Sequence, residues 1–157
     1  MSWEKRAYPG YVVEHPGRLE AGYYLYTPGI HGLEFSKALL EGRILGGSCG
    51  GVVYVPPRTF CPDTFESEEK LVDVTDFEWV VVTYTTITRD LYGNKLQHPK
   101  IVAVVRPRGC EGGLIHIVKA EPGEIRTGLR VKPVFKPREQ RKGTITDILY
   151  FEVVEHG

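Results

Sequence analysis

Cysteine, methionine, asparagine and net charge are all scarce in this 157-residue chain, and each shortage excludes something. Twenty basic side chains balance twenty acidic ones, so no overall charge attracts the protein to nucleic acid or to an anionic membrane. No apolar run approaches the ~20 residues that a bilayer-spanning helix needs. Residues 1–6 lead into no apolar signal segment, so we expect a soluble, cytoplasmic protein without membrane contact.

The three cysteines, Cys49, Cys61 and Cys110, cannot all pair within one chain. This odd number argues against the disulfide framework of a small secreted domain. The chain also has one Asn, two Gln and one Met, a shortage of heat-labile side chains that indicates a thermophilic source.

Two of the cysteines stand in a pattern typical of a zinc ribbon from which half of the ligands are missing. A structural zinc takes four ligands, usually as two Cys-x2-Cys pairs. Here Gly46 stands three residues before Cys49, and Thr64 stands three residues after Cys61. We therefore expect no zinc, and we interpret Cys49 and Cys61 as vestigial ribbon positions that are free thiols, a disulfide or residual metal ligands.

The first part of the chain predicts an arm and one short helix. Residues 1–31 mix Tyr, Pro and Gly without steady periodicity, which is typical of an extended arm with turns. We expect its tyrosines to cover the core of this chain rather than a partner. Residues 32–41 have the apolar spacing of a helix, and Gly42 is placed to end it in the left-handed conformation.

After residue 69 the sequence becomes rich in β-branched and aromatic residues between turn signals. Five main strands are expected, over residues 79–89, 101–106, 114–119, 129–135 and 148–154. Strands at this spacing predict a mainly β protein with a five-stranded OB-fold barrel over residues 69–157, preceded by the helix and ribbon over 32–68. Pro133 cannot donate to a ladder, so its strand should run at an edge or carry a bulge.

The order of these parts resembles a family of acyl-CoA-associated proteins that join a rubredoxin-like zinc ribbon to an OB-fold. The resemblance covers about residues 32–154 and rests on the Pro56-Pro57-Arg58-x-x-Cys61-Pro62 run, the strand over 128–135 and the Asp147-Ile-x-Tyr-Phe ending. It implies a scaffold without catalytic residues that partners a thiolase-like enzyme and helps to pass coenzyme A or its thioesters. The chain departs from the family pattern at Gly46 and Thr64.

A binding role for coenzyme A has local support in the loop over residues 136–143, which carries four cations against one anion. Arginine grips phosphate with paired hydrogen bonds, and coenzyme A carries a 3′-phosphate and a diphosphate. The candidate ligand-binding residues are Arg138, Arg141 and Lys142, with Arg58 of the ribbon as a further contact. A solvated charged hairpin that only keeps the protein soluble explains the loop equally well.

The residues give no positive evidence for catalysis. The histidines lie outside any metal motif, and His116 alternates with apolar residues, which favours a hydrogen-bonded core or barrel-face position. Cys110 is expected in a hairpin loop, without a helix N-terminus to lower its pKa. An acyl-CoA hydrolase or transferase would therefore lack a nucleophile.

The alternative function is single-stranded nucleic-acid binding, which both ribbons and OB barrels often support. Residues 101–106 and 114–119 offer no aromatic side chain for base stacking, which counts against this alternative.

Overall fold

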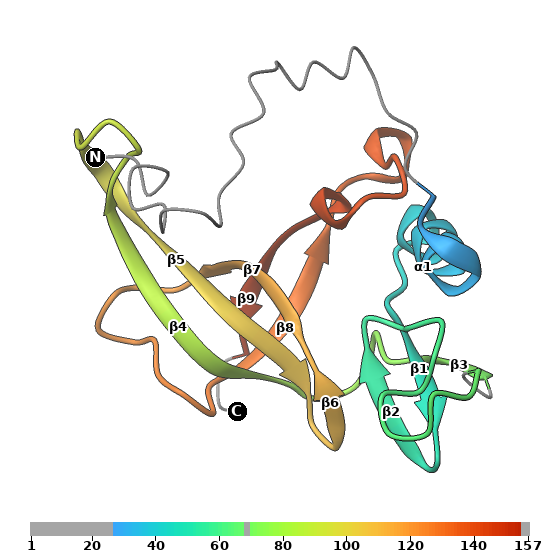
Figure 1. The fold of residues 1–157 in the computed structure, drawn as a ribbon. Coiled ribbons are helices and arrows are strands. Elements are labelled where there is room, and N and C mark those ends of the chain that lie inside the picture. Colours follow the sequence, from blue (N-terminus) through green and yellow to red (C-terminus); the bar gives the residue numbers. More distant parts are fainter. Residues whose placement is uncertain (1–26, 68–69, 155–157) are drawn as a thin grey trace, which may run out of the picture.

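The computed structural model describes residues 27–67 and 70–154, and the expected mainly β architecture is confirmed (Figure 1). Within these residues an α-helix is followed by two β-sheets, one of which closes into a barrel. The tyrosines of the expected arm, over residues 1–26, lie outside the described residues. In the described part of the chain, no helix is long and apolar enough to cross a membrane.

Helix α1 spans Gly29–Glu41 and so begins three residues earlier than the sequence predicts. The last residues of the expected arm are therefore helical. Gly42 ends the helix at φ 80°, in the left-handed conformation, and its N–H donates to the carbonyl of Leu39 at 3.0 Å. Ala38 and Leu39 are buried, which fixes the helix face that packs on the sheets.

The first sheet, called the ribbon sheet below, has the strand order β3-β1-β2-β6. Its members are β1 (Leu45–Cys49), β2 (Val52–Val55), β3 (Lys70–Asp73) and β6 (Cys110–Gly112). Strands β1 and β2 form a hairpin through Gly50 and Gly51, whose φ angles are 55° and 84°. Positive φ at both central residues is the signature of a two-residue turn that suits glycine.

The second sheet is a closed barrel with the strand order β4-β5-β7-β9-β8. Its members are β4 (Trp79–Arg89), β5 (Lys95–Pro107), β7 (Leu114–Lys119), β8 (Arg130–Phe135) and β9 (Ile148–Val153). The five expected strands all form, and their order is that of a five-stranded Greek-key barrel of the OB type. Trp79 and Phe151 fill its interior with ring centroids 5.2 Å apart.

Strand β5 is longer than predicted, because β4 and β5 remain paired as far as Arg89 and Lys95. The segment between the expected strands over 79–89 and 101–106 therefore contains only a short turn, over residues 90–94. Asp90 stabilises this turn, because its carboxylate accepts the N–H groups of Tyr92 and Asn94 at 2.9 and 2.8 Å. The first part of β5 was not predicted because residues 95–100 are mostly polar.

Pro133 lies where β8 has only one strand neighbour. It pairs with Phe151 of β9, whereas the pairs between β8 and β4 involve only Val131 and Arg130. The register also shifts between Val134 and Phe135. The prediction of an edge position or a bulge is confirmed, since the missing N–H of proline interrupts no ladder on that side.

The two sheets interleave along the sequence. Strand β3 follows residue 69 yet pairs with β1, and β6 comes from between two barrel strands yet pairs with β2. Gly113 N–H donates to the carbonyl of Val55 at 2.7 Å at this junction. Cys110 is buried in β6, so the expectation of a loop thiol is wrong: the chain here returns to the ribbon sheet instead of looping into solvent.

Candidate functional site

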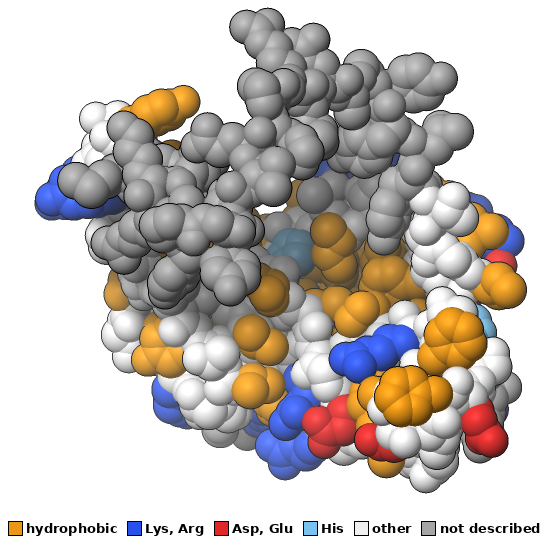
Figure 2. All heavy atoms as spheres, in the orientation of Figure 1, with side chains coloured by type: hydrophobic (Ala, Val, Ile, Leu, Met, Phe, Trp, Pro, Cys, Tyr) orange, Lys and Arg blue, Asp and Glu red, His pale blue; other side chains and the backbone are white. Residues whose placement is uncertain are grey.

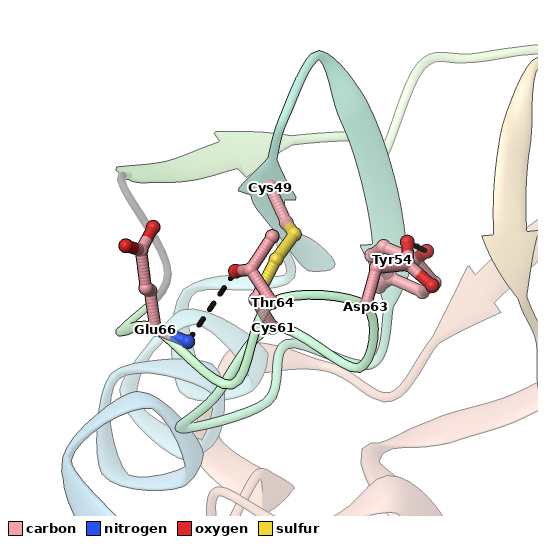
Figure 3. The surroundings of a disulfide bond; sticks show 6 residues. All are labelled: Cys49, Tyr54, Cys61, Asp63, Thr64 and Glu66. Carbon is pink, nitrogen blue, oxygen red and sulfur yellow. Dashed lines mark hydrogen bonds between the residues drawn. A yellow bond between two sulfur atoms is a disulfide. The ribbon is translucent and has the colours of Figure 1, made fainter.

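A disulfide joins Cys49, at the end of β1, to Cys61, in the loop that follows β2 (Figure 3). The two Cα atoms are 5.7 Å apart, and both side chains are buried. Of the three states that the sequence leaves open for this pair, the structure has the disulfide. Thr64 lies beside it, and its hydroxyl accepts the N–H of Glu66 at 3.3 Å.

The residues around the disulfide do not fit a structural zinc. A side chain at Gly46 would place its Cβ 2.6 Å from Cγ1 of Val53 and 3.0 Å from the carbonyl oxygen of Tyr54. Apolar packing therefore occupies the space that a third ligand would need. The described residues contain no group of three His, Cys, Asp or Glu side chains placed to hold a metal. Four ligands in a tetrahedron are the rule for structural zinc.

Arg58 lies in the loop that the disulfide holds. Its guanidinium carbon is 5.4 Å from the centroid of the Tyr54 ring, and its carbonyl accepts the Nδ1–H of His31 at 2.6 Å. Tyr54 donates its hydroxyl to Asp63 at 2.9 Å, and this hydrogen bond raises the pKa of the phenol. The contact with His31 attaches the loop to the N-terminal part of α1, and the contacts with Tyr54 attach it to β2.

The loop over residues 136–147 is built around the buried carboxylate of Asp147. Its oxygens accept the N–H groups of Lys142 at 2.9 and 3.0 Å, Gly143 at 2.6 Å and Thr144 at 3.1 Å. Burial alone would raise the pKa of Asp147, but these backbone N–H groups outweigh burial and hold it below its ordinary value. The carboxylate therefore gives the loop a fixed backbone.

Arg141 attaches the same loop to the C-terminal end of α1. Its Nε donates to the carbonyl of Lys136 at 2.7 Å and its Nη1 to the carbonyl of Leu40 at 3.3 Å. The guanidinium also lies 5.4 Å from the centroid of the Phe135 ring. Arg141 is thus engaged within the protein, on backbone carbonyls and an aromatic face.

The structure does not gather the four predicted cations at one point. Arg138 and Lys142 are exposed in the loop and form no ion pair with the described residues. Arg58 lies at the other end of α1. The helix residues in contact, His31 and Leu40, are nine positions apart, or about 14 Å along the axis.

A groove of about 380 Å³ lies where β7 and β9 separate. These parallel strands pair only at Val118 with Phe151 and at Lys119 with Glu152. Among the described strands, the earlier part of β7 pairs with β5 alone. Figure 2 shows hydrophobic side chains gathered around a hollow in this region of the molecule. The lining residues are Val102, Ile115, His116, Ile117, Ile145, Thr146, Ile148 and Leu149.

His116 is the one lining side chain of the groove with an ionisable ring. Its Nδ1 is buried and has no hydrogen-bond partner among the described residues. The edge of the ring contacts Phe151, with centroids 5.8 Å apart. The sequence predicted a hydrogen-bonded histidine, and in this respect the prediction is wrong, because the ring packs between aliphatic and aromatic side chains.

Cys110 has the wrong surroundings for a nucleophile. Burial raises the pKa of its thiol, although Arg106 acts in the opposite direction. The thiol therefore stays protonated at neutral pH, whereas a reactive cysteine needs a stabilised thiolate.

The sequence reasoning missed the groove entirely. A signal was present, because Ile115 and Ile117 are apolar at positions that the alternation assigns to solvent. A strand that is apolar on both faces is typical of one covered on both faces. The structural role of Asp147 was also missed, although this residue is part of the family resemblance. The spacing Thr144-x-x-Asp147 matches a capping box and was the available signal.

Together these features define a class of protein, a disulfide-containing ribbon sheet joined to an OB-type barrel. The chain is similar to a solved DUF35 family protein of unknown function from Sulfolobus solfataricus, with 27% identity and a TM-score of 0.66 over 80% of this chain and 87% of that one.

It is also similar to a structure described as an Ltp2-ChsH2(DUF35) aldolase, with 17% identity and a TM-score of 0.56 over 77% and 92%. This second likeness shows the fold alone. No family model and no curated protein sequence matches the chain.

Proposed function

We propose that this protein is a non-catalytic partner of a thiolase-like enzyme, and that it binds coenzyme A or an acyl-coenzyme A and helps to pass it between active sites. The observation that supports this most is the shared fold with two DUF35 proteins. One of them is described by a name that couples ChsH2(DUF35) with a second component, Ltp2, in an aldolase. A partner role also agrees with the protonated, buried state of Cys110.

For the phosphates of coenzyme A we propose Arg138 and Lys142. Both side chains are exposed, and both stand on a backbone that Asp147 and Arg141 hold in place. Arg141 then acts as a positioning residue, and Arg58 is a separate contact at the other end of α1. Charge-assisted bonds from preordered donors are the strong ones in phosphate recognition.

Nucleic-acid binding has weaker support as an alternative. Single strands bind OB barrels by stacking bases on aromatic side chains. The corresponding face of β5 and β7 carries Val102, Val104, Ile115 and Ile117, all aliphatic. Zinc is not part of the proposal, because Gly46 and Thr64 supply no thiolate.

Coenzyme A binding is tested by calorimetric titration of the full chain. We expect Arg138→Ala/Lys142→Ala to weaken the affinity about tenfold or more, since hydrogen bonds to charged groups contribute about 1.5–3 kcal/mol each. Lys95→Ala/Lys100→Ala is the matched control, because it removes the same charge from exposed positions of β5. Equal affinity of the first variant and the wild type would remove Arg138 and Lys142 from the proposal.

The partner is tested by affinity capture from the native organism, with the tagged full chain as bait. We expect a thiolase-like protein to co-purify in stoichiometric amount and to remain bound through gel filtration. Its consistent absence across growth conditions would contradict the partner role.

A further inference from the structure

We infer that the groove between β7 and β9 binds a neutral aliphatic acyl chain, with the imidazole of His116 directed to the carbonyl of that chain. This inference rests on the proposed function and deepens it, because it assigns the acyl part of a thioester to a site of its own. The loop with Arg138 and Lys142 then holds the polar end.

The groove lies where the pairing between two neighbouring strands of the closed barrel is short. Strands β7 and β9 share only the two residue pairs at Val118 and Lys119, near the end of β7. The 3-10 helix η3 (Ile145–Asp147) stands opposite the earlier part of β7 and supplies the other wall. A pocket of about 380 Å³ falls within the usual range of about 300–1,000 Å³ for small-molecule sites.

The chemistry of the walls favours an aliphatic chain. Six of the eight described residues that line the groove are Val, Ile or Leu, and no Lys, Arg, Asp or Glu is among these eight. Ile115 is 72% exposed, so its side chain is accessible to a ligand in the groove. A charged head group would lose its hydration in this groove without gaining a counter-ion.

His116 adds a single polar feature to these walls. Because Nδ1 is sealed without a partner among the described residues, Nε2 is the nitrogen left for a ligand. With the proton on Nε2, the neutral ring donates a hydrogen bond and suits a carbonyl oxygen. The hydroxyl of Thr146 provides a second polar group in the lining. These donors suit a carbonyl oxygen, and the aliphatic walls favour an uncharged thioester over a free carboxylate.

The groove also adjoins the proposed phosphate contacts along the chain. Lys142 stands three residues before Ile145, the first lining residue of η3, and Asp147 binds the backbone of this connection. The proposed phosphate contacts and one wall of the groove therefore belong to the same short stretch of chain.

The test uses S-octanoyl-N-acetylcysteamine, a neutral thioester without the phosphates of coenzyme A. We expect the probe to shift the ring signals of His116 in NMR spectra of the full chain and to bind with a measurable heat. Ile115→Lys should weaken this binding about tenfold, since burying such a side chain accounts for roughly a factor of ten or more. Leu91→Lys is the matched control, because Leu91 is fully exposed at the tip of the β4–β5 hairpin.

The outcomes separate this inference from the proposed function. If the probe leaves His116 unchanged while coenzyme A still binds, the groove assignment fails and the proposed function stands. If the probe binds at His116 and coenzyme A does not bind, the groove stands and the phosphate proposal fails. Circular dichroism checks the fold of Ile115→Lys, and Leu149→Lys repeats the test from the opposite wall. Unchanged probe affinity in both folded variants would overturn the assignment.

Discussion

At the scale of single residues, Asp147 organises the loop over residues 136–147. Its carboxylate accepts three neighbouring backbone N–H groups and is itself buried. A buried acceptor of this kind stabilises the fold only while it is ionised and fully paired. The loop with the proposed phosphate contacts and the η3 wall of the groove both depend on it.

The lowered pKa of Asp147 predicts how stability depends on pH. A carboxyl group with a depressed folded-state pKa contributes stability above its unfolded value of about 3.9, and the contribution is lost as the pH falls through the folded value. We expect Asp147→Asn to reduce the free energy of unfolding by about 1–3 kcal/mol at pH 7. The difference from the wild type should shrink between pH 4 and pH 2.

Urea unfolding at pH 7, 4 and 3 measures this dependence. Asp76→Asn serves as the control, since Asp76 is exposed on the turn before β4. An equal loss of stability in the Asp147 variant at every pH would contradict the ionic role of the carboxylate.

At the scale of elements, the ribbon sheet keeps its shape without a complete set of zinc ligands. The disulfide between Cys49 and Cys61 closes a loop with a sequence separation of 12. Apolar packing over Gly46 and the hydrogen bond from Tyr54 to Asp63 support the same segment. A covalent link and local packing thus hold this segment in place.

Reduction of this disulfide should therefore destabilise the protein, and zinc should not compensate. A loop of this length is expected to contribute about 2–3 kcal/mol, or roughly 5–10 °C in Tm. Thermal unfolding with and without a phosphine reductant measures the shift, and equimolar zinc is then added to the reduced protein. Recovery of the original Tm with zinc, or stoichiometric zinc in the purified protein, would contradict this account.

The helix and strands were predictable where turn or cap residues mark their ends in the sequence. The five barrel strands stand between clear turn signals, and Gly42 marks the end of α1. Strand β6 was not predictable, because Cys110-Glu-Gly lies between glycines and resembles a turn. Its identity as a strand depends on pairing with β2, where Val53 is the partner of Cys110, 57 residues later in the chain, and no local pattern records such a partner.

At the scale of the whole molecule, the arrangement of the barrel strands was predictable from the sequence, but the position of the groove was not. Alternation and turn spacing favour a closed barrel, and the barrel is closed. The groove arises where β7 and β9 stop pairing, and the sequence does not specify where parallel strands diverge. Likewise, the cations of residues 136–143 were recognisable as a cluster, whereas the engagement of Arg141 with Leu40 required the position of α1.

The pairing of β6 with β2 also limits how this polypeptide can be divided. Residues 32–68 contain only two of the four strands in their sheet, because β3 and β6 come later in the chain. A fragment that ends at residue 68 leaves the free edges of β1 and β2 uncovered, and such edges recruit other strands into aggregates. Truncated variants, chimeras with relatives and split reporters should therefore keep β1, β2, β3 and β6 in one polypeptide, because these strands join the amino-terminal third of the protein to its middle.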